Sequence, residues 1–132
     1  MIAQYWDETE DVLAKEIVSD WPAFLELVRR TETSSSGRGI PAIELSDDED
    51  VTCIFIRFEG GGCTVATGDS KGLAWPVEFN NGGCEYVHYD YFGSWSEVPA
   101  DLVIPREKAL AAVKSFLETG DISPSVLLLV RE

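Results

Sequence analysis

The alternation of hydrophobic and polar residues in the last third of the chain predicts strands, a helix and a closing strand. Residues 84–92 alternate and include four aromatic side chains, as in a half-buried strand. Pro105 indicates a helix start, apolar side chains follow at helical spacing, and Gly120 suits the helix end because glycine accepts the left-handed conformation. The unbroken apolar run at residues 126–130 predicts a final strand that is covered on both faces.

A second segment near the N-terminus has helical spacing. Trp21, Phe24, Leu25 and Val28 repeat at i, i+3, i+4 and i+7, so we expect a helix over residues 19–30. The preceding residues 12–18 fit either a first strand or the beginning of a helix, because their periodicity does not separate the two.

The middle of the chain predicts strands. A short strand is expected at residues 40–45, and residues 51–58 carry apolar side chains on both alternating sets, as in a central strand covered on both sides. Three glycines then turn the chain into an antiparallel partner at residues 63–67. Residues 73–79 are also strand-like, but Pro76 lacks a backbone donor and therefore indicates a sheet edge.

These elements predict an α+β fold. We expect a mainly antiparallel sheet of about five or six strands, with helices near residues 19–30 and 105–119 packed against it. The closing strand–helix–strand step should be right-handed if its strands are parallel neighbours. The 132 residues suffice for one core, so we predict a single domain over residues 1–132, of which residues 1–11 form an acidic tail.

Charge changes the picture of what this domain binds. The chain has 24 Asp and Glu against 10 Lys and Arg, which gives a formal net charge of −14. Direct binding to nucleic acid is disfavoured, because every phosphate contact would have to overcome that repulsion. An acidic surface instead attracts basic partners and speeds their encounter. The alternative is that the acidic residues only keep a small protein soluble.

The residue types needed for catalysis or metal binding do not occur at useful spacing. His88 is the only histidine, and Cys84 stands about 13 Å from it along the same strand, too far for proton transfer. The cysteines, which also include Cys53 and Cys63, lack the close spacing of a zinc site. The acidic residues cluster in apparent loops rather than facing each other across a cleft. We therefore expect a protein that is not an enzyme and that uses no cofactor or metal.

Localisation follows from two further patterns. No apolar run approaches the length of a membrane span, and the N-terminus goes into acidic sequence without the basic and apolar regions of a secretory signal. An odd number of cysteines without paired spacing indicates reduced, mostly buried thiols. These patterns predict a cytoplasmic protein without membrane contact.

The C-terminal part carries a resemblance to a known family. Its residues are Gly82-Gly83, the aromatic strand, Val98-Pro99, Ile104-Pro105, the segment Ser115-Phe116-Leu117-Glu118-Thr119-Gly120 and the apolar strand. Over roughly residues 50–130 the chain resembles a bacterial immunity-protein family that neutralises polymorphic toxins delivered between competing bacteria. That family includes inhibitors of DNA cytidine deaminase toxins. The Pro105 helix ending in Phe-Leu-Glu-Thr-Gly is the most specific part, and it is a structural motif.

The resemblance implies an immunity protein that binds a cognate toxin and inhibits it. The expected partner is the C-terminal domain of a nucleic-acid-targeting toxin, a deaminase or a nuclease, whose basic substrate groove an acidic protein would occupy. Aromatic residues beside acidic turns suit recognition, since Tyr and Trp supply anchor area, although the same aromatics could instead pack the sheet. The predicted contact residues are Asp47, Asp48, Glu49, Asp50, Glu78, Glu85, Tyr89, Tyr91 and Trp95.

Two alternatives remain open from the sequence. An acidic DNA mimic that blocks a DNA-binding enzyme would use the same charge and need no dedicated toxin. An adaptor domain without an inhibitory role would need neither. The range of inhibited proteins separates the first alternative from immunity, because a mimic competes with DNA for DNA-binding proteins in general, whereas an immunity protein acts on one toxin.

Overall fold

The computed structural model describes ten stretches of the chain, namely residues 1–7, 9–34, 41–47, 51–58, 62–69, 72–76, 86–92, 94–99, 102–127 and 129–131. Its elements, in order, are β1 (Ile2–Asp7), β2 (Val12–Ile17), α1 (Trp21–Ser34), β3 (Ile43–Ser46), β4 (Thr52–Arg57), β5 (Cys63–Asp69), β6 (Gly72–Pro76), β7 (Tyr86–Tyr91), β8 (Ser94–Pro99), α2 (Arg106–Thr119) and β9 (Leu129–Arg131).

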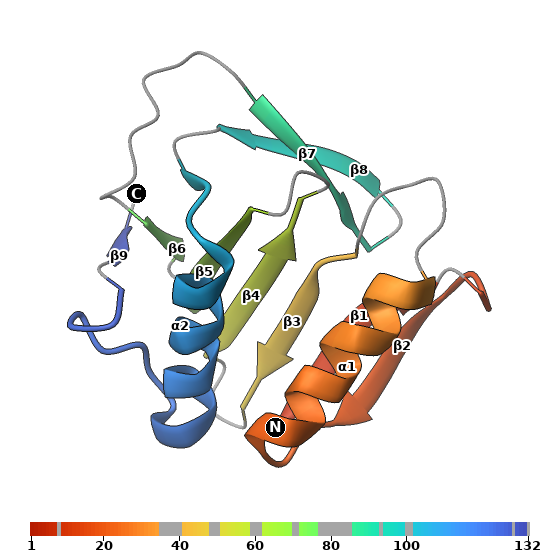
Figure 1. Cartoon of the computed structure of the whole chain (residues 1–132), viewed down its shortest axis with the longest axis horizontal. Coiled ribbons are helices and arrows are strands. Elements are labelled where there is room, and N and C mark those ends of the chain that lie inside the picture. The colour runs from red at the N-terminus through yellow and green to blue at the C-terminus, as the bar shows by residue number, and fades with distance from the viewer. Residues whose placement is uncertain are drawn as a thin grey trace.

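The main sheet has seven strands in the order β2-β1-β3-β4-β5-β6-β9, and every neighbouring pair is antiparallel. Strands β7 and β8 form a separate antiparallel pair. Both helices lie in front of the sheet in Figure 1, so they cover the same face. The predicted α+β class is confirmed, with more strands in the main sheet than the sequence indicated.

The two faces of the sheet have separate cores because successive strand side chains point to opposite sides. Cys53 and Phe55 of β4 belong to the core beneath the helices, together with Phe24 of α1 and Phe116 of α2. The helix-side packing includes an edge-to-face contact between the rings of Phe24 and Phe55, whose centroids are 5.7 Å apart. The helix-side face of the expected central strand at residues 51–58 is therefore buried, as predicted.

The opposite face of β4 is covered by the β7–β8 hairpin. Ile54 and Ile56 share the second core with Val98 of β8, and the rings of Phe58 and Tyr89 meet edge-to-face at 6.1 Å. The hairpin turns tightly, since Tyr91 pairs directly with Ser94. Phe92 in this turn has a φ of 50°, the left-handed conformation that such two-residue turns require.

Both predicted helices are present. The Asp20 carboxylate caps α1 by accepting a hydrogen bond from the Ala23 N–H at 2.9 Å. Helix α2 follows Pro105 and ends at Gly120, whose φ is 81° and whose N–H donates to the Phe116 carbonyl at 2.8 Å. The glycine at this position is explained by that left-handed conformation.

The N-terminal segment was predicted wrongly in one respect and left undecided in another. Residues 2–7, expected within an acidic tail, form β1, which pairs with both β2 and β3. Asp7 instead organises the turn after this strand, because its Oδ1 accepts hydrogen bonds from the Thr9 and Glu10 N–H groups. Residues 12–18, left undecided, contain β2, which lies at the sheet edge.

The C-terminal strands also differ from expectation. β6 is not an edge strand, because β9 pairs along it, and Pro76 is the last residue of β6 opposite Leu129. The final strand begins at Leu129 rather than residue 126, and it occupies the sheet edge. β8 and β9 belong to different sheets, so the connection through α2 is not a parallel crossover.

Candidate interaction surface

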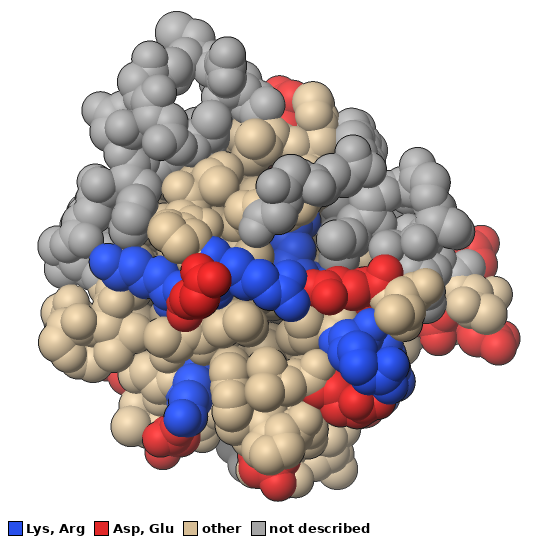
Figure 2. All heavy atoms as spheres, viewed as in Figure 1, with Lys and Arg blue, Asp and Glu red and all other residues tan. Residues whose placement is uncertain are grey.

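On the helix-covered face, basic side chains lie beside acidic ones. Figure 2 shows Lys and Arg side chains in contact with Asp and Glu across this side of the molecule. The ion pairs are Arg29–Glu26, Arg30–Glu16, Arg57–Glu32, Arg106–Glu32 and Lys114–Glu118. Much of the positive charge in the part of the chain that the structure describes is therefore neutralised locally.

Arg57 is the buried member of this set, with a side chain that is 1% exposed. Its Nη1 donates to the Val28 carbonyl at 3.0 Å, and its Nη2 donates to the Thr31 hydroxyl at 2.5 Å and to the Pro41 carbonyl at 3.2 Å. The Glu32 carboxylate lies 3.3 Å away and also accepts from Arg106 at 2.6 Å. Arg57 thus joins α1, β4 and, through Glu32, the start of α2.

The energetics of this network are set by burial. Desolvation lowers the pKa of Arg57 to about 10, although the Glu32 charge and hydrogen bond act in the opposite direction. For Glu32, burial alone would raise the pKa, but the hydrogen bond from Arg106 and the charges of Arg106 and Arg57 outweigh it and hold the pKa below its ordinary value. The network therefore keeps both partners charged at neutral pH.

The Glu32 carboxylate should make stability depend on pH. A carboxyl group whose pKa is lower in the folded state stabilises the fold above its unfolded value of 4.5 and loses that contribution as pH falls below it. We expect Glu32→Gln to be less stable than wild type by about 2 kcal/mol at neutral pH. In urea unfolding at a series of pH values, the difference should shrink as the solution becomes more acidic.

Glu26→Gln is the control for this experiment, because the Glu26–Arg29 pair is more than half exposed. Its effect should be small at every pH, because water and salt screen an exposed ion pair. A stability difference for Glu32→Gln that stays constant from neutral to acidic pH would contradict the assigned role of the carboxylate.

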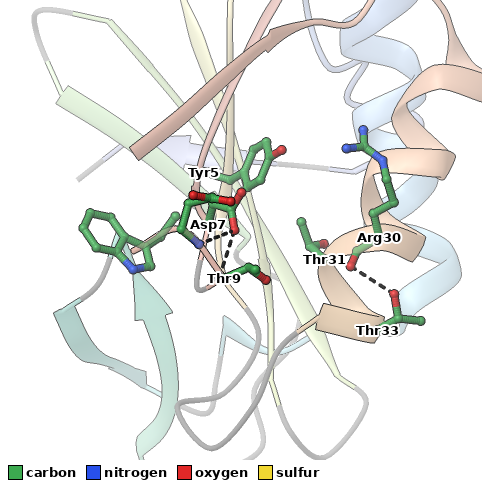
Figure 3. A pocket seen from close by; sticks show the side chains of 8 residues that line it. Tyr5, Asp7, Thr9, Arg30, Thr31 and Thr33 are labelled. Carbon is green, nitrogen blue, oxygen red and sulfur yellow. Dashed lines mark hydrogen bonds between the residues drawn. The ribbon is translucent and has the colours of Figure 1, made fainter. Parts of the chain in front are cut away.

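A pocket of about 410 Å³ lies between the β1–β2 turn and the C-terminal part of α1. In Figure 3, Tyr5, Asp7 and Thr9 face Arg30, Thr31 and Thr33 across it. Two of its lining residues share a partner, because the Glu16 carboxylate accepts from the Tyr5 hydroxyl at 3.1 Å and from Arg30 at 2.5 Å. The lining residues are Tyr5, Trp6, Asp7, Thr9, Glu10, Arg30, Thr31 and Thr33, a set without histidine, cysteine or lysine.

The sheet face opposite the helices is uncovered at β1 and β2. Ile2 stands directly opposite Ile17, and Trp6 stands opposite Leu13, so these four side chains lie on one face. Ile2, Leu13 and Ile17 are 48%, 41% and 77% exposed. We call these four residues, Ile2, Trp6, Leu13 and Ile17, the β1–β2 stripe.

The β1–β2 stripe shares its face with the β7–β8 hairpin. The register places Gln4 of β1 opposite Glu44 of β3, and Glu44 opposite Ile54 in the core beneath the hairpin. The Glu44 carboxylate lies 3.5 Å from the Tyr91 hydroxyl, which ties the hairpin to β3. One side of the sheet therefore carries an uncovered apolar stripe next to the aromatic hairpin.

Four of the nine predicted contact residues lie in the described part of the chain, and five lie outside it. Asp47 follows β3, where its backbone and carboxylate both bond to Val51. Tyr89 and Tyr91 are half-buried on the second core, and burial raises the pKa of each hydroxyl. Trp95 lies in β8 opposite Asp90, with only its backbone described. The others, Asp48, Glu49, Asp50, Glu78 and Glu85, lie outside the described residues.

His88 lies on the outer side of the hairpin, opposite Glu97 in the register, with its Nε2 3.3 Å from the Glu97 carboxylate. Cys53 and Cys63 are buried and unpaired, and burial raises the pKa of the Cys63 thiol to about 11. A thiol in that state is a poor nucleophile. These residues therefore offer an exposed histidine–glutamate contact and two inert thiols rather than a reactive centre.

A family model described as immunity protein Imm1 matches residues 3–129. The chain belongs to this family. The match runs from β1 to β9, so it confirms the resemblance in the C-terminal part and extends it to the N-terminal strands and α1. A search of curated proteins finds no match to the chain.

Membership in the Imm1 family indicates an immunity protein directed against a toxin, and it suggests an inhibitor that is not an enzyme. Neither α1 nor α2, the helices of the described structure, is long and apolar enough to cross a membrane. The sequence had drawn attention to the hairpin and the acidic turns but had missed Arg57 and the β1–β2 stripe.

Proposed function

We propose that this Imm1 protein inhibits a nucleic-acid-targeting toxin, a deaminase or a nuclease, by occupying its basic substrate groove. The observation that carries the proposal is the charge distribution. The net charge is −14, while Arg29, Arg30, Arg57, Arg106 and Lys114 are each paired with a carboxylate. The acidic excess thus stays largely uncompensated and is available to a basic partner.

The same electrostatics explain why a nucleic-acid enzyme suits this inhibitor. A groove that binds phosphates is lined by Lys and Arg, and its affinity for polyanions depends strongly on salt. An acidic protein competes for such a groove and approaches it faster than an uncharged one. A specific complex of this kind buries about 1,600 Å² in total, about 800 Å² on each partner.

Competition with nucleic acid tests the proposal. The candidate partner is the C-terminal domain of the protein encoded next to this chain. If the inhibitor occupies the substrate groove, added nucleic acid should weaken its apparent affinity for that domain in proportion to the nucleic-acid concentration. A ternary complex of inhibitor, toxin domain and nucleic acid would contradict the proposal.

A DNA mimic is the second candidate, favoured by the same net charge. It predicts that the chain also displaces DNA from unrelated DNA-binding enzymes. Running the competition assay with such an enzyme separates the two, because an immunity protein should leave it unaffected.

Neutralising the acidic run at residues 47–50 should slow association with the toxin. We expect Asp47→Asn, Asp48→Asn and Asp50→Asn together to lower the association rate about three- to tenfold and to flatten its salt dependence. The dissociation rate should change less, since the effect acts on the encounter. Surface-based binding kinetics at several salt concentrations would measure both rates.

The control carries the same change in net charge on the helix side, with Glu107→Gln, Glu118→Gln and Asp121→Asn, all at exposed positions. It should have a smaller effect on association. Equal slowing by the two triple variants would mean that overall charge rather than the acidic run at residues 47–50 steers binding.

A further inference from the structure

We propose that the β1–β2 stripe is a docking surface for the toxin domain, which would meet it with apolar side chains flanked by Lys or Arg. The inference rests on the proposed function for the identity of the partner and adds the place of contact. It concerns a part of the surface distinct from the aromatic hairpin and the acidic turn that the sequence indicated.

The stripe consists of two cross-strand apolar pairs, and the Gln4–Lys15 pair stands between them on the same face. Ile2 pairs with Ile17 and Trp6 with Leu13, so two cross-strand apolar pairs stand on one face. The two pairs are four residues apart, about 13 Å along the strands. Single exposed apolar residues are ordinary on soluble proteins, but four large apolar residues on one face of two paired strands exceed that scattered exposure and indicate an interaction site.

Its position within the fold makes the exposure unusual. The helices cover the other face of β1 and β2, where Ala3 and Tyr5 are buried, and the hairpin covers the stripe's own face only over the central strands. The stripe also continues toward the hairpin through Gln4 and Glu44, which are paired in the register. A partner seated on the stripe would therefore lie next to Tyr91, which contacts Glu44.

Charge decides between a second copy of this chain and a basic partner. Four acidic residues lie at the ends of the stripe: Asp7, Glu10 and Asp11 at the β1–β2 turn, and Asp47 after Ser46, which pairs with Ile2. They outnumber Lys15, the basic residue that lies between the two apolar pairs on the same face. Two copies would bring these carboxylates together, each on a molecule with a net charge of −14. A partner with Lys or Arg around its apolar residues avoids that repulsion. The resulting interface would have an apolar centre and a polar rim, as protein–protein interfaces usually do.

The test compares exposed apolar side chains within the stripe with one outside it. In the variant Leu13→Ser with Ile17→Ser, the stripe loses its β2 half. Ile17 is 77% exposed, so the single variant Ile17→Ser tests the stripe with little risk to folding. Leu25→Ser is the matched control, because Leu25 is 40% exposed but lies on α1, on the other side of the sheet.

Binding kinetics with the toxin domain should separate the variants. We expect the double variant to dissociate at least about tenfold faster than wild type, with its association rate and salt dependence retained, because apolar contacts act on the bound state. Ile17→Ser should dissociate about threefold faster, and Leu25→Ser should match wild type within about twofold. Thermal unfolding of each variant checks that the fold is intact.

Three results would overturn the inference. A folded double variant with unchanged dissociation would exclude the stripe while leaving the proposed function intact. Self-association of the wild type that the double variant abolishes would assign the stripe to contacts between copies. Failure of the wild type to bind the toxin domain at all would overturn the proposed function, and the inference with it.

Discussion

Replacing Arg57 with alanine should destabilise the fold by about 3–5 kcal/mol, the typical cost of removing one partner from a buried ion pair. The substitution would leave the Val28 and Pro41 carbonyls and the Thr31 hydroxyl without the guanidinium that now donates to them. Glu32 would keep only Arg106 among its two arginine partners. Against a total stability of about 5–15 kcal/mol, this loss is large.

Thermal and urea unfolding would measure the effect of Arg57→Ala, with Arg29→Ala as the control. Arg29 also forms an ion pair with a glutamate, but its side chain is 63% exposed. Exposed ion pairs contribute little to stability because water and salt screen them, so the control should unfold close to wild type. Equal stability of the two variants would show that the Arg57 network does not hold α1 and β4 together.

Replacing Phe116 with alanine should cost about 3–5 kcal/mol, as removing a buried aromatic ring usually does. Phe116 has no exposed surface and packs in the core between α2 and the sheet, so its loss leaves a cavity there. Leu117, the next residue, is only partly buried against the same core. Leu117→Ala should therefore cost less than Phe116→Ala, about 1–2 kcal/mol.

The Phe116 experiment also tests the role of the motif that pointed to the family. Phe116 faces the helix-side core, away from the β1–β2 stripe and the hairpin. A milder variant, Phe116→Leu, should fold and bind the toxin domain with wild-type kinetics. Weaker binding by a folded Phe116→Leu protein would mean that the motif contributes to recognition rather than to the scaffold.

The elements that the sequence predicted correctly carry strong local signals. Helix α2 has both a proline start and a glycine whose left-handed conformation ends it, and β4 has apolar side chains on both alternating sets because a core lies on each face. Such signals depend on neighbouring residues alone. They sufficed for the α+β class and for the two helices.

The elements that it missed depend on distant partners. β1 precedes an acidic turn that suggested a tail, and only its pairing with β2 and β3 establishes it as a strand. Pro76 suggested an edge, but the edge position is taken by β9, which is more than fifty residues away in the chain. Local patterns do not contain this information.

Arg57 left a signal that could have been used. It occupies the same alternating set as Cys53 and Phe55 in a strand expected to be covered on both sides, so a buried, paired charge was to be expected. The β1–β2 stripe left a weaker signal, since β2 has apolar residues on both alternating sets and its uncovered face depends on where the hairpin packs.

Titration of the purified chain against the C-terminal domain of the protein encoded next to it, at low and at high salt, measures most directly whether this Imm1 protein is an inhibitor with an acidic binding surface. We expect binding with a dissociation constant of about 1 nM at low salt, weaker binding at high salt, and loss of the domain's toxicity in the complex. No binding to a domain that remains toxic would contradict the inhibition of that toxin. Tight binding that salt does not weaken would contradict the electrostatic mechanism.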